Sequence, residues 1–343
     1  MLIQPTALHH RISVLFREDA VVYNELEGPS QKNPGGGLAT KRMQVAKALP
    51  HANFVVEANQ LGAISLIDAL YFSGGGTSEE FDRRVTDYRR HNGFKILWTS
   101  DFEIFRWTQE QREQILDATD VIAANSIYMY QLLIGYFDGA KVALLTDVID
   151  TNIPDGAEIR EPRIYSCSQI LIEKGIDEII ALYKGLQAGE EIEQTLKRTF
   201  IGSSSTWGLS IRDTDSFNLE IQLDELCELY WSLPYEQVLN FARTAWIYVS
   251  FTRYETFGYA LTEAMLGGCH VFARPHLAYN DRIQAGVITP VENATDMLDK
   301  LKIFLQDNEP KRNDAAIQYV QDNYGLDVFR RQFRNIVGDL YAI

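Results

Sequence analysis

The chain has 343 residues, of which 46% are hydrophobic, and this is enough for two domains of ordinary size with globular cores. Its formal net charge of −15 argues against wholesale binding to nucleic acid or to an anionic membrane. The sequence contains no apolar run near the ~20 residues that cross a bilayer and no secretory leader pattern, so we expect a cytoplasmic protein. The three cysteines lack a C-x-x-C spacing, which predicts free thiols rather than disulfides or zinc ligands.

The first half of the chain alternates apolar runs with helical patterns, as in an α/β protein. Strands are expected at 11–16 or 20–23, and at 54–57, 64–70, 94–99, 118–126 and 141–155. Helices are expected at 38–49 and, from a capping box formed by Thr108 and Gln111, at 108–117. A glycine cluster at 35–37 marks a loop whose backbone can approach a phosphate or sugar closely, and a second cluster at 74–76 marks either a loop over a ligand cleft or a plain surface turn.

Five cations gather between residues 83 and 95: Arg83, Arg84, Arg89, Arg90 and Lys95. Such clusters are most often solvated helix faces, and this is the first interpretation. The alternative is a surface that meets an anionic acceptor, such as DNA.

The second half continues the same pattern after a segment rich in Pro, Gly and charge at 154–162, which predicts a domain boundary between 155 and 156. Strands are expected at 164–167, at 200–202 and at 270–273. Helices are expected at 176–183 and 235–242. Asp213 and Asp215 form a D-x-D pattern in a polar stretch, which we interpret as a loop and not as a metal site. An apolar stripe from Phe329 to Leu340 predicts a last helix, either in the core or crossing back to the first domain.

The most informative stretch is 246–268, WIYVSFTRYETFGYALTEAMLGG. It predicts a buried strand from Trp246 to Phe251, a polar turn, and a helix that Gly258 opens and Gly267 ends. Glu255 and Glu263 would lie about 12 Å apart at ~1.5 Å per helical residue. Carboxylates accept from sugar hydroxyls and the amides of a helix start favour phosphate, so the stretch fits a nucleotide sugar. A helix with a solvated Glu face is the plainer alternative.

Residues 253–273 resemble the E-x7-E segment of the retaining glycosyltransferases of the GT-B fold, the group 1 or family 4-like enzymes. SQILIEKGID (168–177) resembles the G-R-L-x-x-E-K-G segment of the same family, and 118–126 and 141–155 resemble the segments that end its first domain. The resemblance implies two Rossmann-like domains facing across a cleft. The first, 1–155, would bind the acceptor, and the second, 156–343, the nucleotide-sugar donor.

The resemblance also implies roles for individual residues. Glu263 would bind the ribose hydroxyls, Glu255 the hydroxyls of the sugar ring, and Lys174 the departing diphosphate. Asp101 would orient the acceptor hydroxyl. The remaining donor contacts would come from the turn before the helix and from the first Gly-rich loop, namely Thr256, Phe257, Gly258, Gly36 and Gly37. No metal or other cofactor is expected.

Two departures from the family pattern bear on activity. Gln169 stands where the family has an Arg that pairs with the Lys, so Arg253 or Arg274 is the candidate to supply that charge. Ser100-Asp101 stands where many relatives have a His-Asp pair. The favoured function is retaining, metal-independent transfer of a sugar from a nucleoside diphosphate to a hydroxyl of a glycan, a small molecule or modified DNA. The alternatives are a glycosyltransferase acting on a modified DNA base or nucleotide, and a catalytically silent nucleotide-sugar-binding scaffold.

Overall fold

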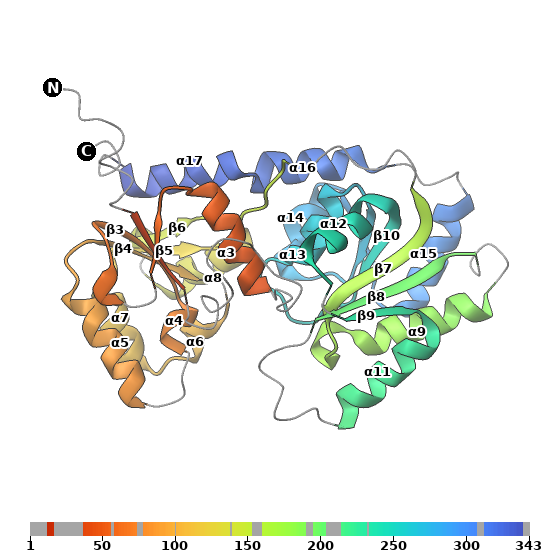
Figure 1. Cartoon of the computed structure of the whole chain (residues 1–343), viewed down its shortest axis with the longest axis horizontal. Helices are drawn as coiled ribbons and strands as arrows, with labels where there is room; N and C mark the ends of the chain where they lie inside the picture. The colour runs from red at the N-terminus through yellow and green to blue at the C-terminus, as the bar shows by residue number, and fades with distance from the viewer. Residues whose placement is uncertain are drawn as a thin grey trace. The chain divides into compact units, whose positions relative to one another are not determined.

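The computed structural model describes residues 12–16, 37–55, 58–73, 78–99, 101–137, 139–152, 160–189, 195–203, 214–231, 233–306 and 312–338. The chain divides into unit 1, which comprises 1–28, 41–150 and 324–343, and unit 2, which comprises 29–40 and 151–323. Each unit contains one six-stranded parallel sheet flanked by helices (Figure 1). The expected α/β class with two Rossmann-like folds is therefore confirmed, whereas the boundary at 155 stays a prediction.

The sheet of unit 1 has the strand order β2-β1-β3-β4-β5-β6. Its strands are β1 (Ile12–Leu15), β2 (Asn53–Val55), β3 (Ile64–Asp68), β4 (Phe94–Thr99), β5 (Val121–Ala124) and β6 (Val142–Leu144). The helices are α3 (Gly37–Ala48), α4 (Leu70–Ser73), α5 (Ser78–Arg90), α6 (Glu103–Arg106), α7 (Gln109–Leu116), α8 (Ile127–Tyr136) and α17 (Leu326–Val337), with single 3₁₀ turns η1 (Ala58–Gln60) and η2 (Gly139–Lys141). Strand β3 is buried along its whole length, as expected of a central parallel strand.

The capping box predicted at the start of α7 is confirmed. The Thr108 hydroxyl accepts a hydrogen bond from the Gln111 amide at 3.2 Å, and the Gln111 side chain accepts one from the Thr108 amide at 2.9 Å. These reciprocal bonds satisfy donors that a helix start otherwise leaves without a partner.

The strand expected at 141–155 is much shorter than predicted, because β6 ends at Leu144. Beyond it the Leu145 amide still donates to the carbonyl of Ala124 in β5 at 2.9 Å, whereas the amides that follow pair outside the sheet. The Thr146 amide donates to the side chain of Gln332 at 2.9 Å, and the Asp147 amide donates to the carbonyl of Asn125 at 2.8 Å. The apolar pattern of this stretch comes from burial in unit 1 rather than from strand pairing.

The interpretation of residues 83–95 as one solvated face is wrong. Arg84 is buried and donates to the carbonyl of Tyr71, and Lys95 is buried and donates to the carbonyl of His91 at 2.7 Å. Only three cations of the cluster are exposed: Arg83, Arg89 and Arg90. Because three cations rather than five are exposed, the case for an anionic acceptor such as DNA is weaker.

The apolar stripe near the end of the chain lies on α17. Phe329, Phe333 and Val337 are each 2% exposed or less, and the Phe329 ring lies 5.6 Å from the Trp98 ring of β4. Helix α17 therefore packs into the core of unit 1.

The sheet of unit 2 has the strand order β12-β11-β10-β7-β8-β9. Its strands are β7 (Glu161–Gln169), β8 (Lys197–Ser203), β9 (Glu228–Trp231), β10 (Ala245–Ser250), β11 (His270–Ala273) and β12 (Ile288–Pro290). The helices are α9 (Ile176–Ala188), α11 (Thr214–Leu226), α12 (Tyr235–Thr244), α13 (Tyr259–Leu266), α14 (Asn280–Gln284), α15 (Ala294–Gln306) and α16 (Asp314–Tyr324), with 3₁₀ turns η3 (Ile172–Lys174) and η5 (Leu277–Tyr279). The strand order reverses between β7 and β10, and ligands of such sheets bind at that switch point.

Most expected elements of unit 2 are confirmed, with two corrections. The apolar positions of α9 are buried: Ile176, Ile179, Ile180 and Tyr183. Strand β7 is longer than predicted. The D-x-D stretch is not simply a loop, because Asp215 lies in the first turn of α11. Asp213 lies outside the described residues, as do Ala20–Tyr23, Gly35, Gly36 and Gly74–Gly76.

Gly175 joins the loop after β7 to the end of β10. Its φ is +73°, and a Cβ at this position would lie 2.2 Å from the carbonyl oxygen of Phe251. A glycine is needed here for both reasons, because L-residues avoid positive φ and no side-chain atom fits against that carbonyl.

Replacing Gly175 with Ala is therefore expected to lower the free energy of unfolding by about 3 kcal/mol or more, measured by urea denaturation. Gly286→Ala is the matched control. Gly286 has a φ of +72°, and no described atom beyond its own residue and its two chain neighbours lies within 4 Å of the place that an added methyl group would take, so only the backbone preference of about 1 kcal/mol should be lost. Equal losses in the two variants would contradict the close approach of Gly175 to Phe251.

Candidate functional site

The loops that follow β7 and β10 lie next to each other at the carboxyl edge of the unit 2 sheet. The two strands pair in parallel, with Ile247 opposite Ile164 and Tyr248 opposite Tyr165. Beyond the strands, the Arg253 amide donates to the carbonyl of Glu173 at 2.8 Å. The structure therefore brings the two stretches that resemble family motifs, 168–177 and 253–273, into direct contact.

Lys174 and Glu255 form an ion pair between these loops. The Lys174 Nζ lies 3.2 Å from Glu255 Oε2 and 3.1 Å from the carbonyl oxygen of Tyr254. The two side chains keep 22% and 25% of their surface exposed. A partly exposed pair of this kind holds its charges in position at little energetic cost and leaves both groups accessible to a ligand.

The polar turn before α13 fixes the direction of the Glu255 carboxylate. Its Oε1 accepts a hydrogen bond from the amide of Thr256 at 3.1 Å, while Oε2 faces Lys174. Thr256 itself is only 7% exposed. The carboxylate is therefore held at the surface by the backbone of a turn whose first and last residues, Thr252 and Thr256, are buried.

The buried side chain of Arg282 packs against the residues that begin α13. Arg282, 1% exposed, donates to the carbonyl of Phe257 at 2.9 Å, and its guanidinium lies 4.8 Å from the Phe257 ring. Gly258 has a φ of +84°, and a Cβ there would lie 2.8 Å from the ring of Tyr279. The first amides of α13 and its dipole favour an anion at this point.

Glu263, just past the middle of α13, is a buried carboxyl. It is 5% exposed and accepts a hydrogen bond from the Tyr235 hydroxyl at 2.8 Å. Burial raises the pKa of the Glu263 carboxyl to about 7, and the hydrogen bond from Tyr235 limits the rise. Burial, and to a smaller extent the nearby Glu263, also raises the pKa of the Cys167 thiol to about 12. The Glu263 carboxyl therefore exchanges its proton near neutral pH.

The two arginines considered as replacements for the missing family Arg differ in their surroundings. Gln169 is the last residue of β7 and brings no charge. Arg253 is engaged by Asp177, with Nη–Oδ distances of 2.8 and 2.7 Å. Arg274 directly follows β11, its amide donates to the carbonyl of Ser250 at 2.8 Å, and its half-buried side chain forms no ion pair with any residue in the described part of the chain. Of the two, Arg274 is the cation whose charge is not already engaged by a carboxylate of the described residues.

His276 is a residue of this edge that the sequence did not reveal. Its Nδ1 accepts a hydrogen bond from the amide of Ala278 at 3.1 Å, so the neutral ring carries its proton on Nε2. Burial lowers the pKa of His276, while Glu255 raises it and Lys174 lowers it, because both charges lie nearby. The only signal in the sequence is its position in the loop after a strand.

Several other predicted residues lie elsewhere. Asp101 belongs to unit 1, where it follows β4 and accepts from the Phe102 amide at 2.7 Å. Gly37 is the first residue of α3, and Gly36 and Ser100 lie outside the described residues. Within the described ranges, no group of three or more acidic, His or Cys side chains is placed to hold a metal ion, and no helix is long and apolar enough to cross a membrane. Cys167, Cys227 and Cys269 are free thiols.

The family model of the glycosyl transferases group 1 matches residues 150–322, just over half of the chain. The chain belongs to this family. The matched residues include the Lys174–Glu255 pair, Glu263 and Arg274, so the recognition made from the E-x7-E segment is confirmed. No curated protein matches this member of the glycosyl transferases group 1 at the level of sequence.

Solved structures show which fold this member of the glycosyl transferases group 1 has. It resembles TarM with 16% identity and a TM-score of 0.59 over 82% of this chain, and it spans only 55% of the length of TarM. A pneumococcal O-GlcNAc transferase, GtfA, has 15% identity and a TM-score of 0.60 over 88% of this chain and 60% of its own. An E. coli trehalose-6-phosphate structure has 11% identity and a TM-score of 0.64 over 97% and 99%. The expected GT-B fold is confirmed.

The raised pKa of Glu263 makes stability depend on pH. Between the unfolded value of 4.5 and about 7, the unfolded chain ionises at this carboxyl while the folded chain does not. The free energy of unfolding should therefore fall as pH rises through this range, by about 3 kcal/mol in total at 1.36 kcal/mol per pKa unit.

Glu263→Gln keeps the shape of the side chain and cannot ionise, so its stability should gain on the wild type by about that amount between pH 4.5 and pH 8. Urea unfolding at several pH values measures the difference. Tyr235→Phe removes the hydrogen bond that lowers the pKa of Glu263, so it should extend the loss of stability to higher pH. Parallel curves for wild type and Glu263→Gln would show that the carboxyl is not protonated in the folded state.

Proposed function

We propose that this protein is a retaining glycosyltransferase that moves a sugar from a nucleoside diphosphate to an acceptor hydroxyl. The observation that carries the proposal is the meeting of the Lys174–Glu255 pair, the start of α13 and the buried Glu263 at the strand-order switch of unit 2. A hydroxyl-binding carboxylate, an anion site and a second carboxylate lie in this order along one loop and helix. A nucleotide sugar has the complementary order of sugar hydroxyls, diphosphate and ribose hydroxyls.

Each of these groups is assigned one role in binding the nucleotide sugar. Glu263 accepts from the ribose hydroxyls in place of the Tyr235 hydroxyl, or together with it. The amides at Phe257 and Gly258 and the Lys174 ammonium face the diphosphate. Glu255 accepts from hydroxyls of the transferred sugar, and Thr256 holds that carboxylate in position. Gln169 donates hydrogen bonds to the phosphate without adding charge.

The reaction needs no protein nucleophile. The bond between the anomeric carbon and the diphosphate oxygen breaks, the acceptor oxygen bonds to the same face of that carbon, and the acceptor proton passes to the leaving phosphate. Charge develops on the departing diphosphate, where Lys174 and the helix start stabilise it. Asp101 orients the acceptor hydroxyl. No metal is assigned to the reaction, because the cations named here perform its usual task.

The structures of the neighbours suggest which donor to test first. GtfA was solved with UDP and GlcNAc, and the E. coli trehalose-6-phosphate structure holds UDP-2-fluoro glucose. UDP-sugars are therefore the first donors to test for this chain. A cytoplasmic location, where nucleotide sugars are made, belongs to the same proposal. The burial of Arg84 and Lys95 speaks against a DNA acceptor.

The test is a thermal-shift and hydrolysis screen of nucleoside diphosphates and nucleotide sugars against the wild type and Glu263→Ala. One nucleotide sugar should raise the melting temperature of the wild type and not that of the variant, and it should slowly release free nucleotide. If no compound shifts the wild type, the donor proposal fails. A shift without any release of nucleotide, with a range of acceptors present, would identify a silent binding scaffold instead.

Arg274 should supply the charge that Gln169 lacks. Arg274→Gln is expected to weaken binding of the nucleotide sugar about tenfold, because one charge-assisted phosphate contact is lost. Arg253→Gln removes the same charge from the surface pair with Asp177 and should change the dissociation constant less than about twofold. A larger effect of Arg253→Gln would reverse the assignment.

A further inference from the structure

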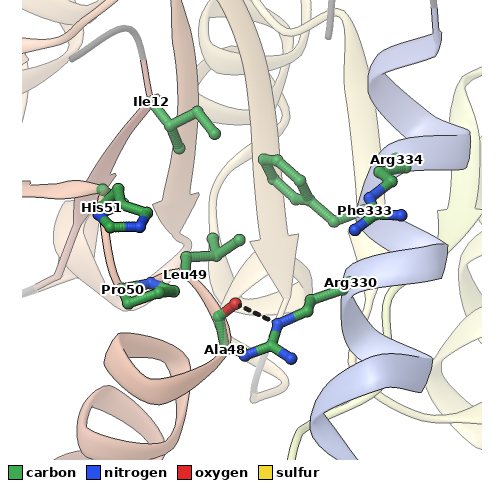
Figure 2. Close-up of a pocket in the computed structure, with 9 residues that line it drawn as sticks. Ile12, Ala48, Leu49, Pro50, His51, Arg330, Phe333 and Arg334 are labelled. Carbon is green, nitrogen blue, oxygen red and sulfur yellow. Dashed lines mark hydrogen bonds between the residues drawn. The ribbon is translucent and has the colours of Figure 1, made fainter. Parts of the chain in front are cut away.

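Unit 1 contains a cavity that the proposed function does not use. A cavity of about 190 Å³ lies between α17 and the segment that links α3 to β2, next to the first residue of β1 (Figure 2). Strand β1 begins at Ile12, so the cavity lies at the amino end of that strand. The Lys174–Glu255 pair and Glu263 belong to unit 2. The cavity is therefore built from different residues than the candidate donor site.

The inner wall of the cavity is apolar. Ile12, Leu49 and Phe333 are 7%, 6% and 1% exposed, and Figure 2 shows their side chains pointing into the same space. Pro50 and Ala48 complete this wall. A wall of this kind favours an aliphatic or aromatic group over a bare inorganic ion.

Arg330 forms one fixed side of the cavity. Its Nε donates to the carbonyl of Ala48 at 2.9 Å, its Nη2 to the carbonyl of Lys47 at 3.0 Å, and its Nη1 to Asp327 at 2.8 Å. The arginine thereby caps the carboxyl end of α3 and ties it to α17. Its guanidinium is held rigid before any ligand arrives.

Arg334 lies one helical turn further along α17 and also lines the cavity. Its side chain is exposed and forms no ion pair with the described residues of the chain. His51 lies on the other side of the cavity. Arg330 is ion-paired with Asp327, so Arg334 supplies the uncompensated positive charge of the rim, and this charge favours an anionic group above the apolar wall.

We propose that this cavity binds a small phosphate monoester that carries an apolar group. The phosphate would lie against Arg334 on the α17 side of the cavity, and the apolar group would lie against Phe333, Leu49 and Ile12. The volume admits a compact molecule rather than a nucleotide sugar. Because the cavity joins α3 to α17, its occupant stabilises the packing of these two helices in unit 1.

Phenyl phosphate is the probe, titrated into the full chain and followed by ligand-observed NMR. We expect saturable binding with a dissociation constant of about 1 mM or tighter. Phenol has the apolar ring without the phosphate and inorganic phosphate lacks the ring, so both should bind more weakly than phenyl phosphate. Benzoate tests whether a carboxylate can replace the phosphate.

Arg334→Gln should weaken binding of phenyl phosphate about tenfold, since it removes a cation that forms no ion pair with the described residues. Arg331→Gln is the matched control, because Arg331 is exposed on the same helix and does not line the cavity. Lys174→Gln, which removes the ammonium assigned to the donor diphosphate, should leave binding of phenyl phosphate unchanged, and this separates the cavity from the proposed donor site. No saturation, equal losses in the two arginine variants, or loss in Lys174→Gln would each overturn the proposal.

Discussion

The parallel pairing of β7 with β10 is the constraint on which the candidate site depends. These strands carry Lys174 and Glu255 on the loops that follow them, although the two residues are 81 positions apart in the chain. Because adjacent parallel strands end at the same edge of a sheet, the pairing alone brings the two loops together and requires no contact between their side chains. The Lys174–Glu255 ion pair then fixes the side chains on two loops that strand pairing has already brought together. A chain with the same two motifs on strands that are not neighbours could not hold them against one ligand.

Two glycines and a layer of buried side chains keep this edge rigid. Gly175 lets the first loop touch the backbone of Phe251, and Gly258 lets the second loop pass the ring of Tyr279. Beneath them Arg282 is held between Phe257 and Tyr279. Lys174 and Glu255 thus extend from backbone segments that have little freedom to move. This preorganisation is what electrostatic stabilisation of a leaving group requires, since donors that must first reorient lose part of their effect.

Much of the fold and part of the site could be predicted, because the relevant signals are local in the sequence. The strand at 94–99, the capping box at Thr108 and the strand, turn and helix around Glu255 all depend on neighbouring residues. The features that were missed depend on distant contacts. Tyr235 reaches Glu263 across 28 positions, and its pattern indicated only a core helix. Arg84 looked like a surface cation because no sequence pattern reveals the Tyr71 carbonyl that it contacts. The end of β6 was missed for the same reason, since the partner of Thr146 is Gln332.

The burial of Glu263 has a consequence for the energetics of ligand capture. At neutral pH a carboxyl with a pKa of about 7 holds its proton in roughly half of the molecules. A ribose that donates two hydroxyls to it requires the ionised form, so capture of the nucleotide would expel part of a proton into the solvent. The heat of association would then include the ionisation enthalpy of whichever buffer takes up that proton. A carboxyl built into this buried helix would thus couple nucleotide occupancy, under the proposed function, to the acidity of the medium.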